Sequence, residues 1–555
     1  MTIKETLGKS IEKVLLGLGI EVHGIILEHP QDSSLGDYAT NVALLYAKKA
    51  GKNPKELAEE IVSLLNKQKL DSVEEIEIAG IGFINFYLTR ELFTENLKKI
   101  NQDYGKNKLL SGKKVMVEYT DPNPFKEFHI GHLMSNAIGE SISRLVEFSG
   151  AEVKRACYQG DVGMHVATAI HGLLRQGDYH FSDVESSGKA YTLSAMMAGE
   201  YDDVKGEIKE INKKIYDRSD SKINTLYIEG RSKSLEYFEL LYKKLGTKFD
   251  FYFFESESGP VGVEIVKKHK EVFEESEGAV IYKGEKVGLH TRVFITKEDL
   301  PTYESKELGL AEIKDKKYPS DISIVVTGNE VKDYYRVVRA AMKEIKELAD
   351  YEQEIVHIPH GMLRLPSGKM SSRTGDVITA EELLTSVEEK LLNKIPKEHS
   401  ELLNDVAVAA VKYSMLKQEA GKDIIFDFDK SISFTGDSGP YLQYTHARCK
   451  SVIEKGEVEK IKASTKNPSS AMLEIERKLH EFPEVVERAG KEYAPHRVCT
   501  YLYQLASAYN TFYNNTKIVD ASDNESPYKL AVTEAVAQTL ANGLYLLGIK
   551  APNKM

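Results

Sequence analysis

The chain has 555 residues, of which 41% are hydrophobic and 29% are charged, with a mean hydropathy of −0.36, which argues against a disordered chain. A long uncharged stretch, 498–516, is rich in Tyr, Asn, Gln, Ser and Thr, so we expect no membrane-spanning helix and predict three or four globular domains. The net charge of −11 argues against nonspecific wrapping of nucleic acid by the chain as a whole.

The start of the chain lacks the basic segment and the apolar core of a secretory signal. The three cysteines, Cys157, Cys449 and Cys499, are scattered and odd in number, which favours a reducing, cytoplasmic location. No cysteine pair or histidine cluster has the spacing of zinc ligands, so we predict no structural metal.

The first hundred residues alternate helical and strand-like patterns. An apolar run at 42–47 follows a turn, and residues 76–80 and 83–88 have the composition of strands. We predict an α+β domain at 1–110 that ends in a linker near 101–112.

Four compact apolar runs predict the strands of a parallel α/β sheet, because helical stretches separate them. These runs cover 114–119, 152–159, 323–327 and 355–358. We predict a Rossmann-type domain at 111–380. The charged segment 189–248 has long helical periodicity and belongs to a helical insertion at about 165–290.

From residue 379 onward, leucines and valines recur at helical spacing, and the pattern stays helical to the end of the chain. We predict a helical connector at 381–435 and an all-α bundle at 436–555. From Tyr441 onward there are 15 Lys and Arg against 13 Asp and Glu, so this end repels a polyanion less than the rest of the chain.

The sequence His129-Ile130-Gly131-His132 stands where the first sheet strand gives way to a helix. A helix N-terminus favours phosphate, and two imidazoles there can donate hydrogen bonds to a phosphoryl oxygen in a transition state. Gly131 lets a flat base approach the backbone. Histidine pairs also occur by chance, and buried histidines are often only hydrogen-bonded core residues, so the motif alone leaves both interpretations open.

A second loop, 368–375, has glycines at both ends and carries cations and hydroxyls between them. Lys369 and Arg373 can neutralise a leaving pyrophosphate, because phosphoryl and nucleotidyl transfer depend mostly on positioning and charge stabilisation. A solvated basic turn would be the better interpretation if the histidine pair were absent.

Together the two motifs, HIGH and KMSSR, resemble those of class I aminoacyl-tRNA synthetases, and residues 121–128 are similar to the arginyl-tRNA synthetase form of the first. Residues 36–41 resemble the N-terminal additional domain of that family, and 439–448 resemble the entrance to its anticodon-binding domain. Residues 541–544 and Met555 are similar to its C-terminus. The resemblance covers most of the chain in family order.

This resemblance implies ATP-dependent activation of L-arginine to arginyl-adenylate and transfer to the 3′-terminal adenosine of tRNA(Arg). It implies Mg²⁺ with the ATP, tRNA bound before activation, and a monomer. The N-terminal domain is then the part that contacts the tRNA elbow, and the C-terminal bundle binds the anticodon.

For the amino acid, the resemblance places Glu118 and Asn123 at the α-amino group and His129 near the carboxylate and the phosphate. Tyr303 is similar to the tyrosine that packs on the substrate side chain. A guanidinium is best met by the two oxygens of one carboxylate.

Two positions near Tyr303 depart from the family pattern. Glu307 stands where the family usually has Asp, so the charge is kept but the reach is one methylene longer. Glu330 stands where many relatives carry Gln, and it is either a second negative charge at the guanidinium or an exposed turn residue. Asp121 stands where Ser is common, and nothing in the sequence explains it.

For ATP, the resemblance implies a catalytic set of His129, His132, Lys126, Lys369 and Arg373 and a binding set of Gly131, Gly361, Met362, Met370 and Ser371. The second lysine of the usual KMSKS loop is Ser372 here. Lys126, three residues before the HIGH motif, is the substitute found in many relatives that lack that lysine. We therefore expect Lys126 to contact the ATP phosphates.

For tRNA, the resemblance implies contacts by Tyr38 and Asn41 near the elbow and by Arg448, Tyr509 and Asn510 near the anticodon. Unpaired bases are read by stacking and by hydrogen bonds at their edges, which these side chains can supply. Tyrosines at helical spacing also fill helical cores, and we expect about half of the C-terminal tyrosines to do so.

Two other functions remain open. A noncatalytic, tRNA-binding paralogue would be expected to lose the phosphate-binding residues, whereas His129, His132, Lys369 and Lys126 all remain. A class I synthetase for another amino acid would be expected to bring zinc ligands or a large editing domain, and 186–283 is small and charged for the latter.

Overall fold

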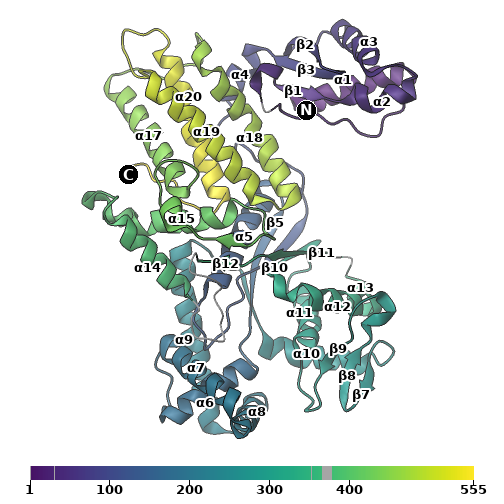
Figure 1. Cartoon of the computed structure of the whole chain (residues 1–555), viewed down its shortest axis with the longest axis vertical. Helices are drawn as coiled ribbons and strands as arrows, with labels where there is room; N and C mark the ends of the chain where they lie inside the picture. The colour runs from purple at the N-terminus through teal and green to yellow at the C-terminus, as the bar shows by residue number, and fades with distance from the viewer. Residues whose placement is uncertain (1, 31, 352, 366–377) are drawn as a thin grey trace. The chain divides into compact units, whose positions relative to one another are not determined.

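The computed structural model describes residues 2–30, 32–351, 353–365 and 378–555 (Figure 1). The chain divides into two compact units. The first consists of Met1–Tyr104, Arg448–Glu484 and Gln504–Leu540, and the second of Gly105–Ala447, Val485–Tyr503 and Ala541–Met555. The last four helices therefore contribute residues to both units. In the described part of the chain, no helix combines the length and apolar composition needed to span a bilayer.

The N-terminal region is the α+β fold that the sequence predicts, with a three-stranded antiparallel sheet in the order β1-β3-β2. On helix α1, Leu7, Ile11, Val14 and Leu15 recur at helical spacing and are buried in the core of this region. Its elements are α1 (Ile3–Gly17), β1 (Tyr38–Thr40), α2 (Val42–Ala50), α3 (Pro54–Lys67), β2 (Val73–Ala79), β3 (Phe83–Leu88) and α4 (Arg90–Leu97).

The second unit is built on a five-stranded parallel sheet in the order β11-β10-β4-β5-β6. Its strands are β4 (Lys114–Glu118), β5 (Glu152–Gln159), β6 (Phe251–Phe254), β10 (Ile322–Gly328) and β11 (Glu354–His360). The four strands predicted from the sequence are confirmed. The fifth, β6, lies inside the range 165–290 expected for the insertion, and it pairs with β5 as an edge strand of the sheet.

This strand order places a topological switch point between β4 and β10. From β4 the chain builds outward through β5 and β6, and it then returns to the other side of β4 to form β10 and β11. Ligands of open parallel sheets bind at the carboxyl ends of the strands beside such a point. The fold therefore predicts where the site lies before any side chain is considered.

Helical segments connect the successive strands of the parallel sheet. The predicted charged helices form α6 (Met164–Gln176), α7 (Val184–Glu200), α8 (Asp202–Asp217) and α9 (Ser221–Leu245) between β5 and β6, around an apolar core of their own. Between β6 and β10 come α10 (Glu255–Lys268), α11 (Tyr303–Lys317) and an antiparallel sheet that the sequence analysis did not predict. Its strands are β7 (Glu274–Ser276), β8 (Ala279–Tyr282) and β9 (Arg292–Ile295). Helices α12 (Lys332–Glu344) and α13 (Lys346–Ala349) join β10 to β11.

The chain after residue 379 is mainly helical, as predicted. Its helices are α14 (Ala380–Leu391), α15 (Leu403–Leu416), α16 (Phe428–Ser431), α17 (Gly439–Val458), α18 (Leu473–Glu492), α19 (Pro495–Asn515) and α20 (Ser526–Leu546). Two short strands, β12 (Leu363–Arg364) and β13 (Ile424–Ile425), pair in parallel and tie the segment after the sheet to this region.

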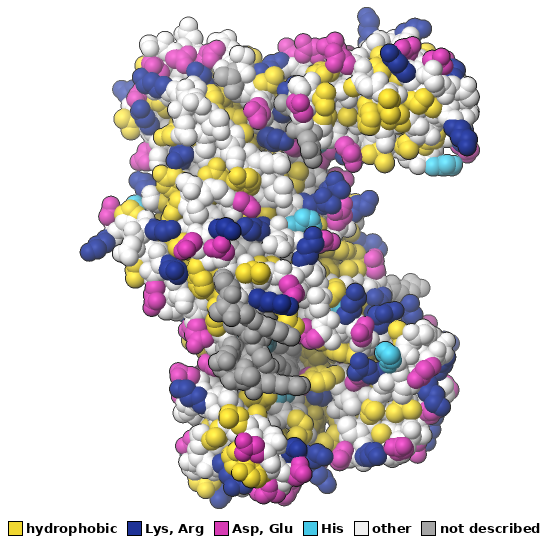
Figure 2. All heavy atoms as spheres, in the orientation of Figure 1, with side chains coloured by type: hydrophobic (Ala, Val, Ile, Leu, Met, Phe, Trp, Pro, Cys, Tyr) yellow, Lys and Arg dark blue, Asp and Glu magenta, His cyan; other side chains and the backbone are white. Residues whose placement is uncertain are grey.

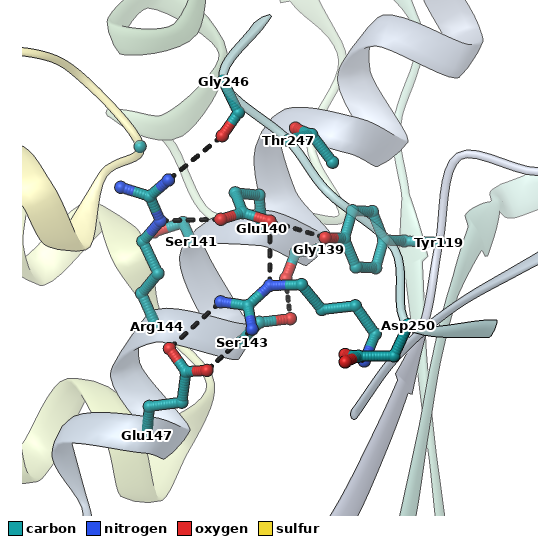
Figure 3. Close-up of polar contacts among 12 residues, drawn as sticks. Tyr119, Gly139, Glu140, Ser141, Ser143, Arg144, Glu147, Gly246, Thr247 and Asp250 are labelled. Carbon is teal, nitrogen blue, oxygen red and sulfur yellow. Dashed lines mark hydrogen bonds and ion pairs between the residues drawn. The ribbon is translucent and has the colours of Figure 1, made fainter. Parts of the chain in front are cut away.

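Helix α5 (Ile130–Phe148) connects β4 to β5, and a buried polar network fixes its middle (Figure 3). The Glu140 carboxylate accepts hydrogen bonds from the Tyr119 hydroxyl at 2.5 Å, from Arg144 Nε at 2.7 Å and from Arg155 Nε at 3.1 Å. Burial alone would raise the pKa of Glu140, but Arg144 and Arg155 hold it below its usual range. Arg155 also binds both oxygens of Glu147. The network joins α5 to β4 and β5.

We expect replacement of Glu140 by Ala to destabilise the protein by about 3–5 kcal/mol, because it leaves the largely buried Arg144 guanidinium without a carboxylate and removes one of the two carboxylates that Arg155 binds. The measurement is the urea midpoint followed by circular dichroism. The matched control is Glu185→Ala, which removes a carboxylate from an exposed pair with Lys189 and is expected to leave the midpoint unchanged. Equal midpoints for the two variants would contradict this account of the network.

Candidate active site

A cavity of about 430 Å³ opens at the carboxyl ends of β4, β5, β10 and β11, at the switch point of the sheet. It is lined by Glu118, Thr120, Asp121, Asn123, His129, Gly131, His132, Ser135, Tyr158, Gly160, Glu255, Tyr303, Glu307, Val325, Val326, Thr327, Gly328, Glu330, Val331, Tyr334, Tyr335 and His360. Among these described residues five carry carboxylates, and none is Lys or Arg. The cavity is therefore suited to a cationic ligand.

The two histidines of the HIGH motif cap the N-terminus of α5, and backbone hydrogen bonds there fix the tautomer of each ring. His129 Nδ1 accepts from the backbone N–H groups of Gly131 at 3.1 Å and His132 at 3.4 Å, and His132 Nδ1 accepts from the His129 N–H at 3.3 Å. Their rings stack with centroids 3.5 Å apart. Because each Nδ1 is an acceptor, the proton of each neutral ring is on Nε2, which is left to donate to a ligand.

Burial keeps both rings uncharged. It lowers the pKa of His129 to about 4, with the positive charge of Lys126 as a further cause, and it lowers the pKa of His132 well below its usual range. Both imidazoles are therefore neutral hydrogen-bond donors throughout the physiological pH range, and they are poor proton acceptors there.

The loop between β4 and α5 is held in an unusual backbone conformation. Thr120, Asp121 and Phe125 have positive φ angles of 84°, 47° and 70°, which residues other than glycine rarely adopt. Side chains hold the loop: Ser135 Oγ accepts from the Thr120 N–H at 2.9 Å, and Ser234 Oγ accepts from the Phe125 N–H at 3.0 Å. Such strain persists where the surroundings fix it, and it is commonly found at functional sites.

Asn123 lies in this loop and lines the cavity beside Gly160. A Cβ at Gly160 would stand 2.3 Å from Asn123 Oδ1, so only glycine leaves room for the amide. This is the physical reason for a glycine after β5.

Three carboxylates, Glu118, Asp121 and Glu307, share one lysine at the base of the cavity. Lys314 Nζ lies 2.5 Å from Glu118 Oε2, and both side chains are almost completely buried. Asp121 Oδ1 accepts from the Tyr158 N–H at 2.8 Å. Burial, and then the charge of Glu118, raise the pKa of Glu307 to about 8 and that of Asp121 well above its usual range. The cluster lacks positive charge, which a cationic ligand would supply.

A second buried ion pair lies beside Tyr303, at the start of α11. Glu255, directly after β6, pairs with Lys306 Nζ at 2.5 Å, and each side chain is only 6% exposed. The Lys306 ammonium lies 5.3 Å from the centre of the Tyr303 ring. Tyr303 itself is 57% exposed, so its ring is available to a ligand in the cavity.

The structure thus brings together the six residues predicted for arginine: Glu118, Asn123, His129, Tyr303, Glu307 and Glu330. Glu330 is exposed and folds back over Gly328 at the carboxyl end of β10. Five further residues in or beside the cavity were not predicted from the sequence: Glu255, Tyr334, Tyr335, Lys306 and Lys314. A usable signal existed for Glu255, because a carboxylate directly after an aromatic strand-forming run predicts a side chain at the sheet edge.

Only some of the residues predicted to bind ATP line the cavity. Gly131 and His132 line the cavity, whereas Gly361 and Met362 do not. The Gly361 N–H donates to the Ala420 carbonyl and the Met362 N–H to Asp423, so neither is available to an adenine edge in this structure. Lys126 lies outside the cavity lining, with its ammonium 4.2 Å from the centre of the Tyr191 ring. Lys369, Met370, Ser371 and Arg373 lie outside the described residues.

Of the predicted tRNA residues, Tyr38 and Tyr509 have fully buried side chains and form part of the cores. Tyr38 donates its hydroxyl to Glu484, and Tyr509 donates its hydroxyl to Thr533, so in this structure neither ring is open to a base. Arg448 hydrogen-bonds Asn510 and lies over the Tyr513 ring, 4.7 Å from its centre. Asn41 precedes α2, is partly exposed and makes no side-chain capping bond.

Comparisons with known proteins agree with this architecture. The Arginyl tRNA synthetase N terminal domain matches residues 1–88, the catalytic domain of tRNA synthetases class I (R) matches 95–428, and the DALR anticodon binding domain matches 442–555.

Individual relatives match over nearly the full length. An arginine–tRNA ligase of Fusobacterium nucleatum is 31% identical over 544 residues, which cover 94% of each chain. The fold is that of arginyl-tRNA synthetase from Thermus thermophilus, with a TM-score of 0.82 at 24% identity and 100% of both chains covered. Its counterpart from Plasmodium falciparum gives a TM-score of 0.80 at 21% identity, over 100% of this chain and 99% of that one. The chain belongs to the arginyl-tRNA synthetase family of class I aminoacyl-tRNA synthetases.

Proposed function

We propose that this chain is an arginine–tRNA ligase and that the cavity at the switch point binds L-arginine and the reacting part of ATP. The observation that carries this proposal is the charge of the cavity lining, with five carboxylates and no Lys or Arg among its described residues. Arginine brings two cations, an ammonium and a guanidinium, and few other amino acids could neutralise such a site.

The amino acid is held at both ends in this proposal. Glu118 and Asn123, at the carboxyl end of β4, receive the α-ammonium, close to the N-terminus of α5. Glu307 and Glu330 receive the guanidinium beside Tyr303, and Glu255, whose carboxylate pairs with Lys306, lines the same cavity. The proposal is supported by the distribution of these side chains along one continuous cavity.

Activation then follows from the position of the histidines. A carboxylate oxygen of arginine attacks the α-phosphorus of ATP, the bond to the bridging oxygen breaks, and pyrophosphate leaves. The Nε2–H groups of His129 and His132 donate hydrogen bonds to the phosphate oxygens as negative charge builds. The 3′-terminal ribose hydroxyl of tRNA next attacks the carbonyl carbon of the adenylate, and AMP leaves.

The charge of the leaving pyrophosphate is assigned to Lys369, Arg373 and Lys126, with Ser371 beside the phosphates. The adenine is assigned to Gly361, Met362 and Met370, which requires the N–H groups of Gly361 and Met362 to leave Ala420 and Asp423 when ATP binds. Among the described residues no group of three or more His, Cys, Asp or Glu side chains could hold a metal ion. Mg²⁺ therefore enters the proposal as the ion of the ATP phosphates, a common mode of binding for this ion.

The parts of the chain divide the work in this proposal. Residues 1–110 contact the tRNA elbow through Asn41, and residues 111–380 form the catalytic domain, with an insertion at about 165–290. Residues 381–435 connect the catalytic domain to residues 436–555, which bind the anticodon near Arg448 and Asn510. We further propose that the chain acts in the cytoplasm as a monomer.

The role of Lys126 is testable on its own. We expect Lys126→Ala to lower the rate of arginine-dependent pyrophosphate exchange about 10- to 100-fold, because one cation is lost from the phosphate site. The KM for arginine should stay the same, since Lys126 does not line the cavity. Lys189→Ala, a nearby exposed lysine paired with Glu185, is the control. Exchange by the Lys126 variant at the wild-type rate would remove Lys126 from the phosphate site.

The function is tested by aminoacylation of total tRNA with labelled arginine, lysine, glutamate or cysteine in separate reactions. Ester formation with arginine alone is the expected result. Charging with another amino acid would identify a different synthetase, and tRNA binding without charging would identify a noncatalytic paralogue.

A further inference from the structure

Helix α12 follows β10 and borders the active-site cavity at its first turn. Val331, Tyr334 and Tyr335 line the cavity, and the buried face of the helix, with Val337, Val338 and Ala341, packs into the core next to β9 and α10. The helix is therefore fixed to the catalytic domain by one side and leaves its other side to solvent.

The solvent side of α12 is a continuous basic face, formed by Lys332, Arg336, Arg339 and Lys343. Their spacing of four, three and four residues brings them within an arc of about 60° on the helix surface and along about 16 Å of its axis. Lys332, Arg336 and Lys343 are exposed, and Arg339 is partly exposed. In Figure 2, dark-blue side chains gather over the region where Figure 1 labels α12 and α13.

The basic face is not neutralised from within the helix. Among the described residues, none of its four cations makes an ion pair, although such pairs are frequent elsewhere on the surface. The two acids of the helix, Asp333 and Glu344, lie on one flank, about 60° and 80° around the helix axis from Arg336, the nearest of the four cations, and Glu344 is engaged by Tyr282 and Lys286.

Besides burial, the positive charge of the basic face lowers the pKa of a nearby histidine. Burial lowers the pKa of His357, on the neighbouring strand β11, to about 4, and the positive charges of Arg339 and Lys332 contribute to this shift. A chain with a net charge of −11 thus carries a basic helix face next to residues that line an acidic cavity.

We propose that the basic face of α12 binds the backbone phosphates of the acceptor end of tRNA and guides its 3′ end into the cavity. This inference rests on the proposed function, because that function requires a nucleic-acid strand to reach the adenylate. A polyanion with regularly spaced charges matches a row of cations along a helix, and phosphate contacts of this kind set position without reading sequence. The acidic cavity alone would repel the nucleic-acid strand, and the basic face of α12 beside it offsets that repulsion.

The test uses the full-length protein and a tRNA(Arg) transcript, with binding measured by fluorescence anisotropy over a range of salt concentrations. The variant Arg336→Gln/Lys343→Gln, called the stripe variant below, removes two exposed charges from the basic face of α12. We expect binding about tenfold weaker at low salt, and a slope of log K against log salt smaller by about 1.4–1.8, as two lost phosphate contacts require. The matched control is Lys209→Gln/Lys213→Gln, which removes two exposed charges from α8, and it should bind as the wild type does.

A second transcript that lacks the single-stranded 3′ end locates the contact. If the basic face holds the acceptor end, the stripe variant and the truncation remove the same interaction, so their effects should be less than additive. Unchanged tRNA binding by the stripe variant at all salt concentrations would overturn the proposal, and so would full additivity with the truncation. Loss of binding to phosphatidylserine vesicles with unchanged tRNA binding would assign the basic face to a membrane instead. Wild-type arginylation, measured alongside, fails only if the proposed function itself is wrong.

Discussion

Replacement of Glu307 by Gln is expected to lower kcat/KM for arginine in pyrophosphate exchange by about 10²–10³-fold, with most of the change in KM. A guanidinium held by a buried carboxylate makes charge-assisted hydrogen bonds worth about 1.5–3 kcal/mol each, and the amide can neither carry the charge nor accept at both atoms. Thermal stability should be unchanged or higher, because the substitution removes one of three carboxylates that repel each other around Lys314.

The pH dependence separates this role from a merely structural one. Because burial beside Glu118 raises the pKa of Glu307 to about 8, the carboxyl group must lose a proton before it can receive a guanidinium. The KM for arginine should therefore fall as the pH rises toward about 8, by at most tenfold per unit, and level off above it. The neighbouring charges that set this pKa are Glu118, Lys314, Glu255 and Glu304.

Two variants at position 307 serve as controls for each other. In Glu307→Gln the pH dependence of KM should be weaker, and in Glu307→Asp, the residue usual in the family, activity should stay within about tenfold of the wild type. A Gln variant with wild-type KM, or an Asp variant as inactive as Gln, would contradict the assignment of this carboxylate to the guanidinium.

Replacement of His129 by Asn is expected to lower kcat for pyrophosphate exchange by about 10²–10³-fold while the fold stays intact. The loss is that of one preorganised donor to the developing phosphate charge, which typically contributes about 3–4 kcal/mol. Asparagine is a good helix N-cap and its Oδ1 can accept from the N–H groups of Gly131 and His132, as Nδ1 does in the wild type. It has no donor where the imidazole presents Nε2–H.

Comparison with His129→Ala separates capping from catalysis. Alanine loses both functions, so this variant should be about 1 kcal/mol less stable than the Asn variant and about equally inactive. Because the pKa of His129 is only about 4, the wild-type kcat should show no titration of this ring between about pH 6 and 9. An Asn variant within tenfold of the wild-type rate would show that His129 only caps the helix.

Much of the fold could be predicted from local patterns. The strands at 114–119 and 323–327 are β-branched runs buried on both faces of a parallel sheet, which produces a continuous apolar signal. Strand β6 escaped prediction because it has only four residues and follows the long charged helices, so that its aromatic run was taken as part of the insertion. The antiparallel strands β7 and β8 are equally short, with three and four residues.

The site was predictable only where chemistry coincided with a recognisable motif. Glu118, Asn123 and His129 lie within twelve consecutive residues of one strand and loop, so their convergence follows from a single local unit. Glu255 lines the cavity from α10, and Lys314 pairs with the lining residue Glu118 from α11. These two residues are 59 positions apart, and only the fold brings them to the same edge of the sheet. The burial of Tyr509 was hidden for a related reason, since a tyrosine at helical spacing has the same pattern in a core and on a surface, and nothing local to Tyr38, the first residue of β1, showed that its ring is buried.

The claim on which the rest depends is that the cavity selects its substrate by positive charge at both ends. The most direct measurement compares arginine with citrulline, its uncharged isostere, in pyrophosphate exchange by the wild-type protein with tRNA present. We predict a kcat/KM for citrulline at least about 10³-fold lower, because the buried carboxylates would be left without a cation. Citrulline activation within tenfold of arginine would contradict the account.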